Sequence, residues 1–216
     1  MSEAKKYMLN ADVLTFQEFV THEPLPLSKI QGAVLEFLQG RDDAVLFGAQ
    51  AVNAYVSEPR ATQDVDIMSN RAHEFAEELR EHLSERFHIA VRVREVKDKG
   101  LRIYQVRKEG NRHLVDVRIE SHLPGSRLVE DINVLEPVEL IVSKVLSYDS
   151  RRGKPKAGTD WRDLGMLLVR FPELKTGEGE VSRLLRERQA NEFAIKFWQE
   201  LVGQDFSVGE DDDLSF

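Results

Sequence analysis

Two aspartates separated by one apolar residue are the strongest chemical signal in this chain. Asp64 and Asp66 flank Val65, and Ile67 continues the alternation that is typical of a short β-strand. Because strand side chains alternate between faces, both carboxylates are predicted to point the same way while Val65 and Ile67 enter a core. Adjacent carboxylates repel each other, and hard oxygen ligands suit Mg²⁺ or Mn²⁺. The pair therefore predicts a divalent-cation site; the alternative is a solvated sheet edge with two surface acids.

A third carboxylate, Asp116, lies in a later strand-like segment, residues 113–119. Apolar residues alternate with Asp116 there, so its side chain is expected on the face opposite to theirs. If this strand lies beside the Asp64 strand, three carboxylates converge, and such a set can hold two divalent ions about 3.5–4 Å apart. That arrangement suits phosphoryl-type transfer, in which the protein supplies positioning and charge stabilisation. The alternative is one polar residue on a half-exposed strand.

A glycine turn precedes the acids. Gly48 follows a short apolar segment, and Ala49 and Gln50 are expected to open a helix. Backbone N–H groups at the start of a helix can meet a phosphate, and the small Ala49 side chain leaves room for its approach. The sequence therefore predicts phosphate contacts at Gly48, Ala49 and Gln50.

The elements that must position these residues follow from hydrophobic periodicity and turn signals. Strands are expected over residues 44–47, 64–68, 89–93, 101–103 and 115–119. Helices are expected over residues 28–39, 49–57, 70–87, 137–146, 159–168 and 181–202. Asn70 and Thr159 are predicted N-caps, Gly40 is a predicted C-terminal cap, and residues 97–100 are a predicted hairpin turn.

The order of these elements predicts an α/β (α+β) fold, with a mixed β-sheet core flanked by helices and a helical C-terminal part. The expected divisions are an N-terminal extension over residues 1–27 and a catalytic core over 28–134. A helical subdomain over 135–203 and an acidic tail over 204–216 follow. A basic loop at 151–156 is equally compatible with a solvated turn and with a phosphate or RNA contact.

Composition narrows the class of protein. The chain has 216 residues, of which 41% are hydrophobic and 31% charged, enough for one generous domain or two small ones. The absence of cysteine excludes disulfides and thiolate zinc sites and fits a reducing cytoplasm. A net charge of −8 argues against broad, non-specific nucleic-acid binding. No apolar run approaches the roughly 18 residues that span a bilayer, and no signal peptide is evident, so a cytoplasmic protein outside the membrane is expected.

The combined motifs resemble the nucleotidyltransferases of the polymerase-beta type. Members of that superfamily carry a glycine turn opening a helix, an acid–apolar–acid–apolar strand, and a third acid on a later strand. Gly48, the segment 64–67 and Asp116 match these features in order. Arg60 and Thr62, just before the paired acids, make the chain similar to the prokaryotic AbiEii-type branch, which includes toxins of toxin–antitoxin pairs. The resemblance covers roughly residues 30–170.

The resemblance implies a role for each matching residue. Asp64, Asp66 and Asp116 would be catalytic and would hold Mg²⁺ (or Mn²⁺). The residues implied to bind the nucleotide are Gly48, Ala49, Gln50, Arg60, Thr62 and Lys144. Asp160 and Asp163 match further acids of the branch.

Structural explanations stay open for several of these positions. Arg60 is also compatible with an ordinary surface arginine, and Lys144 with a surface lysine whose stem covers an apolar stripe. Asp160 and Asp163 near a helix start would in any case favour the helix dipole. The six histidines show no metal-ligand spacing and are interpreted as structural or exposed.

The expected function is Mg²⁺-dependent transfer of a nucleoside monophosphate from an NTP to a hydroxyl, with release of pyrophosphate. By resemblance, the acceptor is a tRNA end, a protein side chain or a small molecule such as an aminoglycoside, and an antitoxin protein is a further partner. The main alternative is a catalytically inactive relative that binds a nucleotide or a partner protein. Ala49 favours that alternative, because relatives usually carry Gly or Ser there. A regulatory α/β domain with surface acids is a third reading.

Overall fold

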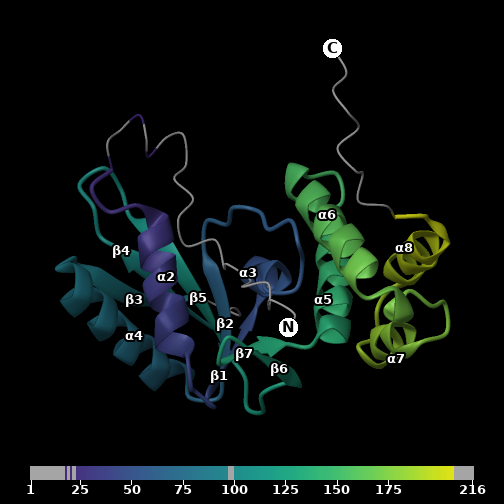
Figure 1. Cartoon of the computed structure of the whole chain (residues 1–216), viewed down its shortest axis with the longest axis horizontal. Coiled ribbons are helices and arrows are strands. Elements are labelled where there is room, and N and C mark those ends of the chain that lie inside the picture. Colours follow the sequence, from purple (N-terminus) through teal and green to yellow (C-terminus); the bar gives the residue numbers. More distant parts are fainter. Residues whose placement is uncertain (1–17, 19, 21–22, 97–99, 207–216) are drawn as a thin grey trace, which may run out of the picture. The chain divides into compact units, whose positions relative to one another are not determined.

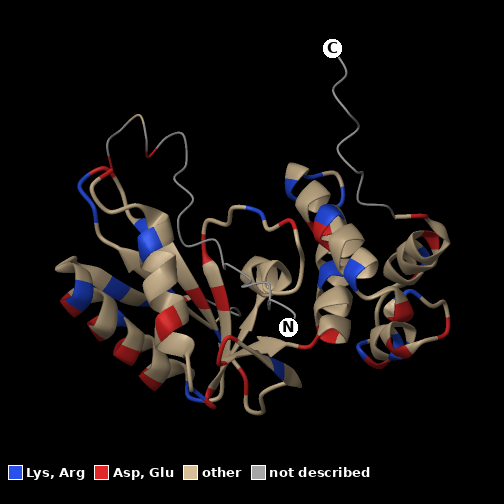
Figure 2. Ribbon diagram, in the orientation of Figure 1, with Lys and Arg blue, Asp and Glu red and all other residues tan. Residues whose placement is uncertain are grey.

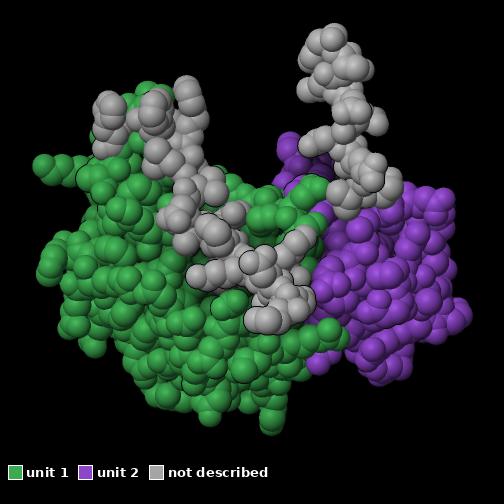
Figure 3. Space-filling view, viewed as in Figure 1, with its two compact units in different colours: residues 1–135 green, residues 136–216 purple. Residues whose placement is uncertain are grey.

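The computed structural model describes residues 18, 20, 23–96 and 100–206, and its chain divides into two compact units (Figures 1 and 3). Unit 1 is Met1–Leu135 and unit 2 is Glu136–Phe216. The described elements of unit 1 are α2 (Leu27–Leu38), β1 (Ala44–Phe47), α3 (Gly48–Asn53), β2 (Val65–Ser69), α4 (Ala72–Phe87), β3 (Val91–Val96), β4 (Gly100–Gln105), β5 (Arg112–Ile119), β6 (Ser126–Val129) and β7 (Ile132–Leu135).

Unit 1 is built on a mixed sheet, as the sequence predicted. Its seven described strands lie in the order β3-β4-β5-β2-β1-β7-β6. The pairs β2–β5 and β1–β7 are parallel, whereas β1–β2, β3–β4, β4–β5 and β6–β7 are antiparallel. The two acid-bearing strands, β2 and β5, are therefore direct neighbours in the middle of the sheet.

One face of the sheet forms the core of unit 1. Val65 and Ile67 of β2 and Val115 and Val117 of β5 are completely buried. Helices α2 and α4 pack on that face, with the predicted apolar positions of α4 turned inward (Figure 1). The buried α4 side chains include Phe75, Leu79 and Leu83. The acids on β2 and β5 alternate with these buried residues and so emerge on the opposite face.

The outer surface of α4 carries charges of both signs (Figure 2). Arg80, for example, pairs with Glu77 at 2.6 Å and with Glu81 at 3.0 Å. This division between an apolar and a charged side explains why the helix periodicity could be recognised in the sequence.

The β6–β7 hairpin was not predicted. Its two-residue turn consists of Glu130 and Asp131, both with positive φ, at 49° and 64°. Glycine or asparagine usually marks such a turn, and neither residue is present here to signal it. The backbone N–H of Gly40 donates to the Asp131 carbonyl at 2.8 Å, which ties the hairpin to the end of α2.

Unit 2 is helical, as the sequence predicted for this part of the chain. Its elements are α5 (Pro137–Ser150), α6 (Pro155–Arg170), the 3₁₀ turn η1 (Pro172–Leu174), α7 (Glu180–Glu187) and α8 (Glu192–Gly203). Trp198 is completely buried, and its indole N–H donates to the Ser182 hydroxyl at 2.9 Å. No helix in the described residues of either unit is both long and apolar enough to cross a membrane.

Two helices of unit 2 differ from the prediction. The expected single helix over residues 181–202 is two helices, because Gln189 is left-handed, at φ 54°, and Asn191 caps α8 by accepting the Ala194 N–H. Helix α6 begins at Pro155, so Thr159 lies inside it rather than capping it; its hydroxyl donates to the Lys156 carbonyl.

Two boundaries in unit 1 also differ. Helix α3 ends at Asn53 rather than near residue 57, and α4 has Arg71 at its N-cap position, so the predicted cap at Asn70 is wrong. The predicted turn at 97–100 lies outside the described residues except for Gly100, which begins β4.

Candidate active site

The parallel pairing of β2 and β5 places the predicted acids side by side. Asp66 is the register partner of Asp116, and Asp64 directly precedes β2. Asp64, Asp66 and Asp116 are all partly exposed, whereas the apolar residues between them are buried. The exposed face of the sheet thus gathers three carboxylates at the junction of two strands.

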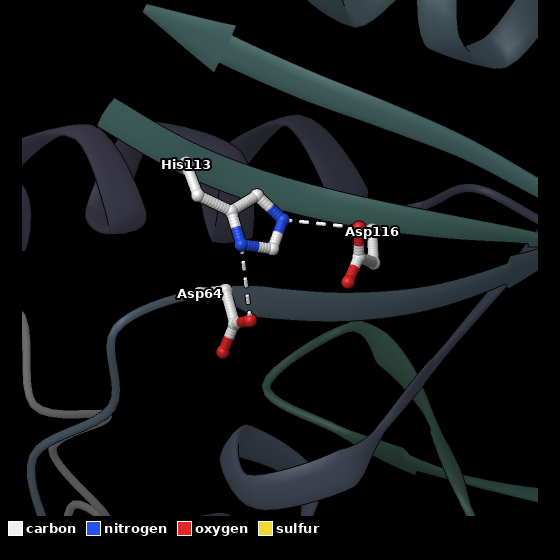
Figure 4. Close-up of side chains that lie close together, drawn as sticks. All are labelled: Asp64, His113 and Asp116. Carbon is white, nitrogen blue, oxygen red and sulfur yellow. Dashed lines mark hydrogen bonds and ion pairs between the residues drawn. The ribbon is translucent and has the colours of Figure 1, made fainter. Parts of the chain in front are cut away.

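A histidine lies between two of these acids (Figure 4). The Nδ1 atom of His113 lies 3.3 Å from an Asp64 carboxylate oxygen, and its Nε2 lies 3.0 Å from Asp116 Oδ1. One ligand atom from each of the three side chains falls within 4.8 Å of the others. Asp64, His113 and Asp116 therefore form a set of oxygen and nitrogen donors compact enough to surround one cation.

A β-bulge explains why His113 shares a face with Asp116. The two residues are three positions apart, so regular alternation would place them on opposite faces. Ile103 of β4 pairs with Val115 of β5, but the next residue, Tyr104, pairs with His113, so one residue of β5 is left without a partner in the register. The extra residue is Leu114, which is buried, and it shifts the alternation so that His113 turns to the acidic face. Sequence spacing alone missed His113 for this reason.

Arg102 binds the third acid through both oxygens. It is the register partner of Asp116 on β4, and its Nε and Nη2 donate to Asp116 Oδ1 and Oδ2 at 2.9 and 3.1 Å. Burial raises the pKa of Asp116, but hydrogen bonds from His113 and Arg102 outweigh burial and lower that pKa to about 2. Asp116 is therefore ionised throughout the physiological pH range. The sequence analysis did not select Arg102, because only strand register reveals its partner.

Gly48 and Asp66 are in close contact. Gly48 has a φ of 68°, and a Cβ atom built on it would lie 2.0 Å from Asp66 Oδ2. Only glycine combines this backbone conformation with such an approach. The Asp66 carboxylate thus packs directly on the turn between β1 and α3, where Gly48 and Ala49 are partly exposed.

A polar network holds the loop that leads into β2. The Asn53 side chain donates to the Arg60 carbonyl at 2.8 Å and accepts the Arg60 N–H at 3.1 Å. Gln50 is buried, and its amide donates to the Thr62 hydroxyl at 2.9 Å, while the Gln31 amide donates to the Thr62 carbonyl at 3.0 Å. The described contacts of Gln50 and Thr62 thus position the loop that delivers Asp64.

The remaining predicted residues lie in unit 2, within an ionic cluster of α5 and α6. Lys144 Nζ lies 2.6 Å from Asp163 Oδ2 and 3.2 Å from Asp160 Oδ1. Asp160 Oδ2 also accepts a hydrogen bond from Arg151 Nη1 at 2.7 Å. Lys144, Asp160 and Asp163 are all buried, so the lysine is not the surface residue that one reading of the sequence allowed. The loop part of the predicted basic segment is short, because α6 begins at Pro155.

Comparison with known proteins identifies the fold. No protein-family model matches the chain, and no curated protein matches it. The crystal structure of JHP933 from Helicobacter pylori has a TM-score of 0.56 at 14% identity, over 88% of this chain and 90% of that one. The Megavirus polyadenylate synthase has a TM-score of 0.58 at 11% identity, over 82% of this chain and 40% of that one. These similarities show that the chain shares its fold with these two proteins.

Proposed function

We propose that this chain is a Mg²⁺- or Mn²⁺-dependent nucleotidyltransferase that moves a nucleoside monophosphate from an NTP to a hydroxyl acceptor. The observation that carries the proposal is the convergence of Asp64, Asp66 and Asp116 on one sheet face beside the Gly48 turn. The fold is one that a polyadenylate synthase also has, which supports the same conclusion.

The donor set fits a divalent cation. Asp64, His113 and Asp116 offer ligand atoms within 4.8 Å of one another, and Asp66 is the register partner of Asp116. Carboxylate oxygens suit both Mg²⁺ and Mn²⁺. When bound, the cation would offset charge on the transferring phosphate and help to activate the attacking oxygen.

The other residues would position the reactants. Asp116 would complete the ligand set of the cation and help to align the acceptor hydroxyl. The partly exposed residues Gly48 and Ala49 would contact the triphosphate through their backbone N–H groups. Gln50 and Thr62 would act indirectly, by fixing the loop that carries Asp64.

The surroundings of the acids favour an anionic acceptor. Arg94 on β3, Arg102 on β4 and Asp116 on β5 are successive register partners, so the arginines share the acidic face. Arg92 lies two residues before Arg94 on the same face and is also exposed. These cations would repel a polycationic aminoglycoside and attract phosphates, so RNA is the acceptor class that we propose.

The test is metal-dependent labelling with α-³²P-NTPs, using a mixture of small RNAs as acceptor and aminoglycosides as the competing class. We expect labelled RNA with Mg²⁺ or Mn²⁺ and a loss of at least about 100-fold in the Asp64→Ala, Asp66→Ala double variant. The matched control removes two exposed acids of α4, Glu77→Ala and Glu81→Ala, and should keep the wild-type rate. Labelling that survives unchanged in the Asp64, Asp66 variant would refute the proposal.

The second candidate is an inactive protein that binds nucleotide without turnover. Ala49 supports it, because the turn lacks a side chain hydroxyl for phosphate. Binding of a fluorescent NTP by wild-type protein, with no labelling of any acceptor, would favour this candidate.

A further inference from the structure

Arg102 is hydrogen-bonded to Asp116, a carboxylate that a catalytic cation would need as a ligand. Its guanidinium donates to both oxygens of Asp116, at 2.9 and 3.1 Å, and His113 Nε2 lies 3.0 Å from one of the same oxygens. A carboxylate has about four lone-pair sites. Three of them therefore face nitrogen atoms of this chain, and about one remains for a metal ion.

The sheet builds this contact into the site. Arg102 and Asp116 are register partners on adjacent antiparallel strands, so their side chains leave the sheet side by side on one face. The planar fork of arginine matches both oxygens of a carboxylate, which a lysine cannot do. A guanidinium at this point also offsets the mutual repulsion of Asp64, Asp66 and Asp116.

The contact is nevertheless open to exchange. The Arg102 side chain is 38% exposed and that of Asp116 is 31% exposed, so the ion pair lies at the edge of solvent rather than in the core. An ion pair in such a position is stabilised only weakly over its separated partners. A divalent cation carries twice the charge of a guanidinium and can approach the carboxylate more closely than a guanidinium can.

We propose that Arg102 is a positioning residue that competes with the catalytic cation for Asp116. The guanidinium holds the acid in place in the metal-free site and withdraws when a cation binds there. Arg102 thereby lowers the affinity of the site for metal, and after its release it faces the anionic reactants on the same sheet face. This inference rests on the proposed function, since it requires that Asp116 takes part in metal binding.

The test measures Mn²⁺ binding by the purified full chain without nucleotide, following free Mn²⁺ by electron paramagnetic resonance. Removing one positive charge a few ångströms from a divalent ion should tighten binding about tenfold in Arg102→Gln. Arg102→Lys keeps the charge but lacks the fork, so it should bind with intermediate affinity. In Arg102→Gln combined with Asp116→Asn, the gain should disappear.

Arg94→Gln is the matched control. Arg94 is the register partner of Arg102 on β3 and lies one strand farther from Asp116, so its removal changes net charge equally without freeing the acid. Its Mn²⁺ affinity should stay within about twofold of wild type. An equal gain in Arg94→Gln, or unchanged or weaker binding in Arg102→Gln, would overturn the inference.

The remaining outcomes separate this inference from the proposed function. Mn²⁺ binding by wild type with no gain in Arg102→Gln overturns the competition alone. No Mn²⁺ binding by any of the proteins overturns the metal site and the competition together. Should thermal melts show that Arg102→Gln does not fold, Arg102→Lys decides, because unchanged affinity in that variant contradicts competition.

Discussion

At the scale of single residues, the site depends on a few close contacts. His113 reaches Asp64 with one ring nitrogen and Asp116 with the other, at 3.3 and 3.0 Å. Arg102 donates to both oxygens of Asp116. Gly48 allows Asp66 to lie against the turn that opens α3.

Gly48→Ala should damage both stability and the site. The left-handed backbone at φ 68° costs an alanine about 1–2 kcal/mol, and the new Cβ would lie 2.0 Å from Asp66 Oδ2. We expect a lower melting temperature and at least about a tenfold loss of NTP transfer, because the carboxylate must move.

Gly158→Ala is the matched control for this variant. Gly158 lies inside α6, where an added Cβ has no neighbour within 4 Å, so alanine should be neutral or slightly stabilising. A Gly48→Ala protein with the melting temperature and activity of wild type would contradict the packing of Asp66 on the turn.

At the scale of elements, strand register and one bulge assemble the site. The parallel β2–β5 pair aligns Asp66 with Asp116, the antiparallel β4–β5 pair adds Arg102, and the bulge at Leu114 adds His113. In unit 2 the corresponding feature is the ionic cluster that joins α5 to α6 through Lys144.

Lys144→Met tests whether that cluster stabilises the fold. The substitution leaves Asp160 and Asp163 buried without the lysine, so we expect a loss of about 3–5 kcal/mol in the free energy of unfolding by urea. Adding Asp163→Asn should restore part of the loss, because one uncompensated charge is removed.

The exposed Lys196 on α8 supplies the control, and Lys196→Met should change stability by no more than about 0.5 kcal/mol. The other reading of Lys144, contact with the triphosphate, predicts a different result. Lys144→Met would then retain wild-type stability and lose affinity for NTP.

At the scale of the whole molecule, charge is the main determinant of its response to pH. The chain has 38 acidic and 30 basic residues, and neighbouring arginines help to lower the pKa values of Asp43 and Asp116. Asp43 is buried, and the hydrogen bond from Arg41 lowers its pKa despite the opposing effect of burial. Asp116, with its pKa of about 2, behaves in the same way.

Because of Asp43 and Asp116, the free energy of unfolding should decrease at low pH. A carboxyl whose pKa is lower in the folded state stabilises that state above its unfolded pKa, near 3.8, and loses this effect as pH falls through the folded pKa. We therefore expect the urea midpoint to be constant near neutrality and to decline from about pH 4 towards pH 2.

Asp43→Asn should be less stable than wild type at pH 7, and the difference should shrink below pH 4. Asp42→Asn, at an exposed neighbouring position, should keep the wild-type pH profile. A destabilisation of Asp43→Asn that is the same at pH 7 and pH 3 would show that its ionisation is unimportant.

The sequence by itself determined the alternation around Asp64, Asp66 and Asp116, the buried side of α4 and the change from a mixed sheet to helices. These are local properties, because the period of apolar residues reflects which side of each element is buried. It did not determine the β6–β7 hairpin, whose Glu130–Asp131 turn lacks the usual residues, or the break between α7 and α8.

Only the tertiary structure decided which chemical groups surround the acids. Arg102 meets Asp116 through strand pairing, and His113 joins them because one bulge residue, Leu114, shifts the alternation of β5. Lys144 is likewise directed to Asp160 and Asp163 by the packing of two helices. Register, bulges and helix packing depend on residues far apart in the chain, so no local pattern of residue types specifies them.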